Sequence, residues 1–197
     1  MAAAPIPQRM TADEYLAAER LAPFRSEFWM GQVYAMSGAV SRHGEVASNL
    51  SRFLQNRLDG RPCRVYGSDI KVGTTKKRGF AYPDLTVVCG ERRFLDEVKD
   101  VLTNPNAIFE VLSDSTRAFD LDGKFKEYQR LESLAHYVLI EPARREVMHY
   151  ERGAAGAWIY RLLTGEHDAV HLLDIELPLN EIYHRVDLEP EPDPDVE

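Results

Sequence analysis

Short apolar runs typical of buried strands occur in this chain together with segments whose apolar residues recur at helical spacing. The runs at 80–89, 107–113 and 135–142 have strand length and are rich in β-branched and aromatic residues. A further strand is expected over 63–72, and a helical turn over 91–100. Residues 42–58 and 117–132 instead repeat apolar positions every three or four residues, which predicts amphipathic helices. This mixture predicts an α/β (mixed α+β) fold in which helices flank a central mixed β-sheet.

The length of 197 residues, with 44% hydrophobic and 28% charged residues, suits one globular domain. We expect a loose leader over 1–10, a single domain over 11–186 and a disordered acidic tail over 187–197. No apolar run approaches the roughly 18 residues of a membrane helix, and the N-terminus lacks the pattern of a signal peptide. A cytoplasmic protein with Cys63 and Cys89 as buried, reduced thiols is therefore expected.

The formal net charge of −8 is unevenly distributed. The tail holds six acidic residues and no basic one, which leaves −2 for the rest of the chain. Residues 57–78 carry seven basic residues against two acidic ones, a local charge of +5 that is densest at Lys76, Lys77 and Arg78. Such a run is most simply a solvated face, and the alternative is a surface that meets phosphates.

Two carboxylates occur in runs that otherwise look like core strands. Glu110 lies inside "AIFEVLS", and Asp84 follows Pro83 and precedes the apolar stretch "LTVV". An ionised carboxylate is costly to bury unless it is paired or bound to a metal ion. Two carboxylates on neighbouring strands would also repel each other, and a divalent cation between them would remove both problems. Such hard oxygen ligands suit Mg²⁺ or Mn²⁺.

The helix predicted after Glu110 spaces Asp120, Lys124 and Tyr128 four residues apart, on one face. The simple interpretation is an exposed Asp–Lys pair beside a half-buried tyrosine. The functional interpretation directs Lys124 at the carboxylates, where it would orient a water molecule or stabilise charge on a phosphate. Ser115 or Thr116 is the expected cap of this helix.

The stretches "YPDLTVV" and "FEVLSDSTRAFDLDGKFKEYQRLESLAHYVLIEP" resemble the bacterial Uma-type "putative restriction endonuclease" family of the PD-(D/E)XK nuclease superfamily. The resemblance includes "EFWMGQVYAMSGAVSRHGEVASNL", in which Glu27, Gly31 and His43 fall at the family's pattern, and it extends over about residues 10–150. It implies a restriction-endonuclease-like core and Mg²⁺-dependent hydrolysis of DNA, with Mn²⁺ as a possible substitute.

Carried over residue by residue, the resemblance implies that Asp84, Glu110 and the backbone carbonyl of Val111 bind the metal ion. In the superfamily pattern a lysine stands two residues after the glutamate, whereas this chain has Leu112 there. Lys124 on the following helix resembles the migrated lysine of this family.

Further roles follow from the same resemblance. His43 starts the helix of 42–58, where related nucleases carry an acid that faces the site, so it is a catalytic candidate; a helix-start residue bonded to backbone is an equal alternative. Glu27 would orient His43 or pair with a basic residue, and Asp120 and Tyr128 would support Lys124. The turn at 76–78 would hold the DNA backbone, and cutting both strands favours a homodimer.

Two alternatives remain open. The first is a catalytically silent module that binds nucleic acid or another partner, which the acidic net charge and Leu112 favour. The second is a hydrolase that uses Ser113 or Ser115 with a histidine. The chain has no G-x-S-x-G motif, and no spacing places His43 or His136 beside these serines.

Overall fold

The computed structural model describes residues 5–6, 9–36, 38, 40–114 and 116–190. Most of the expected leader and the end of the expected tail therefore lie outside the described residues. Ser115, one of the two expected helix caps, also lies outside them.

The main layer is a six-stranded mixed sheet, called sheet B, with the strand order β12–β11–β10–β9–β7–β4. Its strands are β4 (Cys63–Gly67), β7 (Leu85–Cys89), β9 (Ala107–Val111), β10 (His136–Glu141), β11 (Glu146–Arg152) and β12 (Trp158–Leu163). Neighbours β9 and β10 are parallel, and the other neighbouring strands are antiparallel. Strand β9, which carries Glu110, lies in the interior of this sheet.

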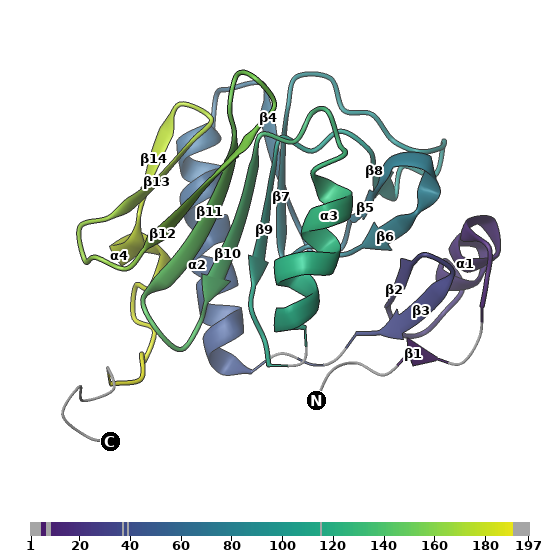
Figure 1. The fold of residues 1–197 in the computed structure, drawn as a ribbon, viewed down its shortest axis with the longest axis horizontal. Helices are drawn as coiled ribbons and strands as arrows, with labels where there is room; N and C mark the ends of the chain where they lie inside the picture. Colours follow the sequence, from purple (N-terminus) through teal and green to yellow (C-terminus); the bar gives the residue numbers. More distant parts are fainter. Residues whose placement is uncertain (1–4, 7–8, 37, 39, 115, 191–197) are drawn as a thin grey trace.

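Helices cover both faces of sheet B, as Figure 1 shows. One face packs against α2 (Ser41–Leu58), the short helix α4 (Leu179–Ile182) and the hairpin of β13 (Ala169–Leu172) and β14 (Ile175–Pro178). The other face packs against η2 (Phe119–Lys124), a π-helical segment that continues directly into α3 (Phe125–Tyr128). The periodic apolar residues of α2 are buried as its sequence predicts: Val46, Leu50, Phe53, Leu54 and Leu58.

A second six-stranded sheet, sheet A, has the order β1–β3–β2–β6–β5–β8. Its strands are β1 (Pro5–Ile6), β2 (Ser26–Trp29), β3 (Gln32–Ala35), β5 (Lys71–Gly73), β6 (Gly79–Ala81) and β8 (Val101–Leu102). Helix α1 (Ala12–Glu19) begins with a capping box between Thr11 and Glu14, and its Tyr15 stacks on Phe28 and Phe80 of the sheet. The 3₁₀ turn η1 (Thr75–Lys77) connects β5 with β6.

The prediction of a mixed α/β fold with flanking helices is confirmed, but the strands form two main sheets rather than one central sheet. The segment 63–72, expected as one strand, divides into β4 in sheet B and β5 in sheet A. The segment 80–89 divides in the same way into β6 and β7. Because Pro83 has no N–H to give to a ladder, the chain leaves sheet A there, and Asp84 stands where it enters sheet B.

Two smaller expectations are wrong. Residues 91–100 form no helical turn; Phe94 makes an antiparallel bridge to Leu102 instead. The helix expected over 117–132 ends earlier, at Tyr128, and only its first two residues, 117–118, are α-helical before the π-helical segment η2 begins.

The expectation of free thiols is also wrong. Cys63 and Cys89 face each other in the register of β4 and β7, and a disulfide joins them. The two cysteines are 26 residues apart, and their opposition could not be predicted from this spacing because it depends on how the two strands pair. Among the described residues, we find no helix with the length and apolar character needed to cross a membrane.

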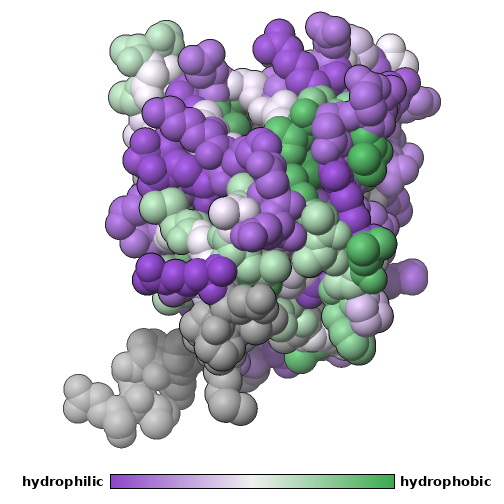
Figure 2. Space-filling model, turned by 90° about the vertical axis from the view of Figure 1, so that its right-hand side faces the viewer, coloured by the Kyte–Doolittle hydropathy of each residue, from purple (hydrophilic) through white to green (hydrophobic). Residues whose placement is uncertain are grey.

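Figure 2 shows the side of the molecule that lies at the right of Figure 1, where sheet A and α1 are found. Hydrophilic residues cover much of this face, with hydrophobic patches between them. Large exposed apolar side chains of this part of the chain include Leu21, Phe24 and Met30.

Candidate functional site

Three carboxylates surround one ammonium group between the two sheets and η2, and a fourth, Asp84, lies near one of them, Glu110. We call this group, Glu27, Asp84, Glu110, Asp120 and Lys124, the acidic cluster. Glu27 comes from β2 of sheet A, Asp84 from the crossing between the sheets, Glu110 from β9, and the other two from η2. Residues far apart in the sequence are therefore brought together here.

Lys124 is the centre of the cluster. Its Nζ lies 3.2 Å from Glu110 Oε1, 3.4 Å from Glu27 Oε1 and 3.0 Å from Asp120 Oδ1. Only 4% of Lys124 and 4% of Glu110 are exposed, so these contacts occur away from bulk water. Asp120 Oδ1 is buried and has the ammonium of Lys124 as its ion-pair partner, without a hydrogen bond of good geometry among the described residues.

Asp84 lies at the more accessible side of the cluster, beside His43 of α2. Its Oδ2 accepts a 2.7 Å hydrogen bond from the Val111 N–H, and its Oδ1 lies 3.3 Å from His43 Nε2. The side chains of His43 and Asp84 are 17% and 18% exposed, several times more than Lys124. A molecule that enters from solvent would therefore meet Asp84 and His43 before Lys124.

Electrostatics in the cluster reflect an excess of acids. Burial raises the pKa of Glu110 well above its ordinary value, and the charges of Asp120 and Asp84 add to the rise although Lys124 opposes it. Burial alone would lower the pKa of Lys124, but the surrounding carboxylates raise it, so the ammonium form is retained. One cation does not neutralise four carboxylates, and the cluster can satisfy the remainder with a proton or a further cation.

The pKa of His43 is shifted as well. Burial acts to lower its pKa, but hydrogen bonds to Asp84 and to the Val111 backbone raise it above the ordinary value. Val111 thus contacts both partners, with its N–H on Asp84 and its backbone on His43. Glu27, by contrast, lies on Lys124, so of its two expected roles it takes the pairing with a basic residue.

Aromatic residues and backbone groups hold the carboxylates in place. Trp29 Nε1 donates to Glu27 Oε2 at 3.5 Å, and the Tyr82 N–H donates to Glu27 Oε1 at 3.0 Å. The Tyr128 hydroxyl donates to Glu110 Oε1 at 3.5 Å, as a supporting residue would. Trp29 was not among the predicted site residues, although its position two residues after Glu27 puts both on one face of β2.

The π-helix η2 determines how Lys124 and Asp120 reach the cluster. A Cβ at Gly123 would lie 2.4 Å from the Phe119 ring, so a larger residue there would force this ring to move. π-Helical turns are rare and often occur at functional sites. The spacing of apolar residues in the sequence predicts a regular helix here and does not predict this wide turn.

The other predicted positions lie outside the cluster. In the basic turn, Lys77 Nζ lies 2.6 Å from Asp13 and Arg78 Nε 3.0 Å from Glu127, while Lys76 adopts a left-handed backbone conformation. The remaining bases of 57–78 come from α2, the turn after it, β4 and β5, and Lys71 among them is buried against Asp100.

His136, one of the two histidines considered for the serine-hydrolase alternative, pairs with another histidine. His136 Nδ1 lies 3.1 Å from His149 Nε2, and both residues are buried in sheet B. This pair accounts for the position of His136.

The chemistry of the donor set fits a hard divalent cation, since the cluster offers carboxylate oxygens in excess of its positive charge. Within the described ranges, however, no three His, Cys, Asp or Glu side chains are already arranged as a metal-binding group. Asp84 and Glu110 would have to exchange their present contacts with His43 and Lys124 for such a cation.

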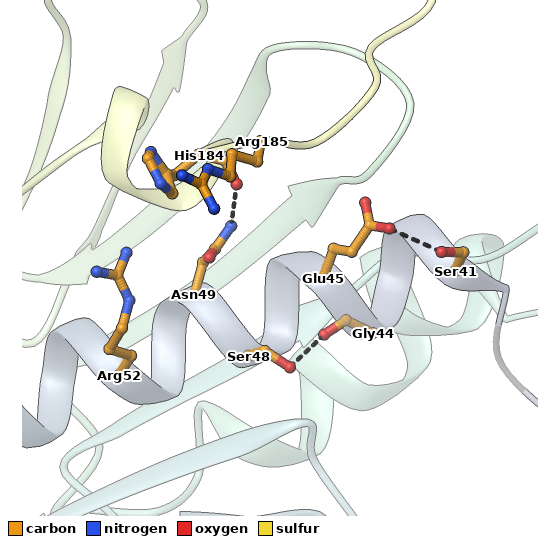
Figure 3. A pocket seen from close by; sticks show the side chains of 8 residues that line it. All are labelled: Ser41, Gly44, Glu45, Ser48, Asn49, Arg52, His184 and Arg185. Carbon is orange, nitrogen blue, oxygen red and sulfur yellow. Dashed lines mark hydrogen bonds between the residues drawn. The ribbon is translucent and has the colours of Figure 1, made fainter.

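A separate open pocket lies on the outward side of α2, next to the end of α4 (Figure 3). Its polar groups serve local structure: Asn49 donates to the His184 carbonyl at 2.8 Å, and Ser41 donates to Glu45 at 2.7 Å. Arg52 lies 3.4 Å from Glu181 of α4. The contacts of Asn49 and Arg52 therefore hold the α4 region against α2, and the pocket is not part of the acidic cluster.

Comparison with a solved structure identifies the class of fold. A structure from Anabaena variabilis, described as a putative nuclease belonging to DUF820, matches 88% of this chain and 97% of its own with a TM-score of 0.73 at 16% identity. The chain therefore has a nuclease-like α/β fold.

The family follows from the sequence comparisons. Residues 12–182 match the model of Uma2, described as "putative restriction endonuclease", and the chain belongs to this family. Two uncharacterised proteins of Synechocystis sp., sll1609 and slr1290, are 34% identical over 158 residues and 33% identical over 156 residues. These matches cover 80% and 79% of this chain and 89% and 80% of the relatives. The resemblance stated from the sequence is confirmed.

Proposed function

We propose that this protein is a metal-dependent endonuclease that hydrolyses DNA phosphodiester bonds. The observation that carries the proposal is the convergence of Asp84, Glu110 and Lys124 from separate segments into one buried cluster. Membership of the Uma2 family and the nuclease-like fold support the same activity.

In this proposal Asp84 and Glu110, with the Val111 carbonyl, hold Mg²⁺ or Mn²⁺. A bound cation of this kind lowers the pKa of its water and polarises a phosphate. Lys124, kept charged by its neighbours, would stabilise the negative charge that grows on the phosphate or orient the attacking water. His43, at the accessible side, is placed to exchange a proton with the reacting groups.

The basic turn is the proposed contact for the DNA backbone. The pair of Lys77 with Asp13 is solvent-exposed, and such pairs contribute little to stability, so Lys77 can exchange its partner for a phosphate. Arg78 is more firmly held, because its partner Glu127 is buried. We therefore assign the phosphate contacts chiefly to Lys76 and Lys77 rather than to Arg78.

The experiment is cleavage of supercoiled plasmid with Mg²⁺ or Mn²⁺ by purified wild type and variants. Asp84→Asn keeps an oxygen for the Val111 N–H and removes the charge, and we expect at least a 100-fold loss of rate. Lys126→Met is the matched control, since Lys126 lies two residues from Lys124 but is exposed and pairs only with Asp122 in a surface ion pair. Equal rates for wild type, Asp84→Asn and Lys126→Met would identify contamination and refute the proposal.

A silent binding module remains the second candidate, because each proposed metal ligand already has an internal partner in His43 or Lys124. The two candidates differ in their response to metal. A nuclease is expected to gain thermal stability on addition of Mn²⁺, and Asp84→Asn should abolish the gain. A silent module that binds DNA should retain the same melting temperature with and without Mn²⁺.

A further inference from the structure

Strand β12 forms an open edge of sheet B. It is six residues long, and three of its apolar side chains are about half exposed: Ile159 at 45%, Tyr160 at 50% and Leu162 at 51%. Proteins usually protect such an edge with Pro, Lys, a bulge or a covering segment, because a free edge invites another strand. The sequence "WIYRLL" contains neither Pro nor Lys.

The backbone of β12 presents hydrogen-bonding groups to this free edge. The Ala157 carbonyl accepts a 2.8 Å bond from Gly153 across the β11–β12 turn, so residue 157 faces inward. Backbone groups alternate in direction along a strand, which turns the N–H and C=O of Trp158, Tyr160 and Leu162 outward. These three residues are available to a further antiparallel strand.

We propose that β12 pairs with β12 of a second copy of this chain, in antiparallel register about a two-fold axis at Tyr160. A two-fold axis perpendicular to the sheet requires a residue to pair with its own copy. With Tyr160 at the axis, each Trp158 faces the Leu162 of the other copy, and the two Tyr160 rings meet. The strand is self-complementary in this register, as an isologous interface requires.

Charge favours the same register. Arg161 is the one charged residue of β12, and its Nη1 lies 2.5 Å from Glu151 of its own chain. With the axis at Tyr160, Arg161 faces Ile159 of the second copy, so the two arginines do not oppose each other. An axis one residue later would place Arg161 against its own copy and bring two like charges together. Of these two registers, charge therefore favours the one with the axis at Tyr160.

One consequence of the pairing rests on the proposed function, whereas the pairing itself does not. Trp158 and Tyr160 contact Phe125 and Tyr150, on the face of sheet B that also carries Lys124 and η2. Both acidic clusters would then open on one side of a continuous sheet. Seven strand spacings separate the two β9 strands, roughly 34 Å before twist, which is close to one turn of DNA.

Oligomeric state and cross-linking test the pairing without any measurement of cleavage. We expect wild type to sediment at twice 22.5 kDa and Leu162→Lys to sediment as a monomer, with Leu21→Lys, at another exposed leucine, unchanged. Tyr160→Cys should give a covalent dimer on mild oxidation, since hydrogen-bonded partners stand about 5.5 Å apart, within disulfide reach. The native cysteines do not interfere because they are joined to each other.

Leu162→Cys is the matched control, because it is equally exposed on the same edge but lies four residues, roughly 13 Å, from its copy in this register. We expect at least tenfold more covalent dimer from Tyr160→Cys than from Leu162→Cys. Equal cross-linking of the two variants would overturn the register. If wild type sediments as a monomer at every protein concentration tested, the proposal that a second copy pairs with β12 is refuted. The partner of this edge would then be a strand of another protein.

Discussion

Lys124 contacts three buried carboxylates at once, Glu27, Glu110 and Asp120, and this makes it both a candidate catalytic group and a structural one. Removal of one partner from a buried ion pair costs far more than the pair itself contributes, because the other charge is left unpaired. The two roles predict different measurements and can be separated.

We predict that Lys124→Met lowers the free energy of unfolding by about 3–5 kcal/mol. The loss should be partly recovered in the double variant Lys124→Met/Glu110→Gln, because one unpaired carboxylate is then removed. Urea denaturation at neutral pH measures both values. Lys126→Met, which breaks an exposed pair with Asp122, should stay within about 0.5 kcal/mol of wild type. A Lys124→Met protein as stable as Lys126→Met would contradict the geometry described for the cluster.

The buried histidine pair of sheet B predicts a pH dependence. Burial, followed by the neighbouring His136, lowers the pKa of His149 to about 4. Arg161 and His171 also disfavour its protonation, while Glu151 favours it. The unfolded chain binds a proton near pH 6.5, so stability from this group is complete above pH 6.5 and is lost as pH falls towards 4.

Between pH 7 and pH 4 this loss amounts to at most about 3 kcal/mol. His149→Gln should reduce the difference in urea midpoint between pH 7 and pH 5, whereas His167→Gln, at an exposed histidine, should not. An unchanged pH dependence in His149→Gln would show that the pair does not set acid stability.

At the scale of elements, packing of β6 against β2 connects the site with sheet A. A Cβ at Gly79 of β6 would lie 2.4 Å from the ring of Trp29, which also holds Glu27. Because this ring is buried, we predict that Gly79→Ala costs about 1–3 kcal/mol and lowers cleavage.

Gly44→Ala is the matched comparison on α2. Nothing lies within 4 Å of its added Cβ, and alanine favours a helix interior, so we expect stabilisation by up to about 1 kcal/mol. Thermal unfolding of the two variants should therefore show shifts of opposite sign. A stabilised Gly79→Ala would mean that Trp29 is free to move and does not fix Glu27.

The elements also show what could be predicted from sequence. The helix α2 was predictable to within one residue, because its buried positions follow a strict period. Glu110 and Asp84 stood out because a carboxylate inside an apolar run has few explanations. The division of 80–89 between two sheets was not predictable from periodicity, since the register of β6 and β7 depends on partners far away in the chain. The π-turn of η2 and the opposition of Cys63 and Cys89 depend on tertiary contacts in the same way.

For the whole molecule, the net charge of −8 opposes association with a polyanion. Residues 191–197 carry four of the acids, so truncation after Pro190 changes the formal net charge from −8 to −4. We predict that the truncated protein binds duplex DNA more tightly at low salt and that the difference shrinks as salt rises. Fluorescence anisotropy over a salt series measures this. Equal affinities at low salt would show that the charge of the tail does not influence binding of duplex DNA.

In the proposed site, Asp84 and Glu110 meet at one cation beside Lys124. Diffraction from a crystal soaked in Mn²⁺, collected where manganese scatters anomalously, would locate this cation. We expect one anomalous peak within coordination distance of both carboxylates, roughly 2.0–2.3 Å from their oxygens, with His43 moved away from Asp84. An empty cluster with the Lys124–Glu110 and His43–Asp84 contacts intact at saturating Mn²⁺ would refute the proposed metal site.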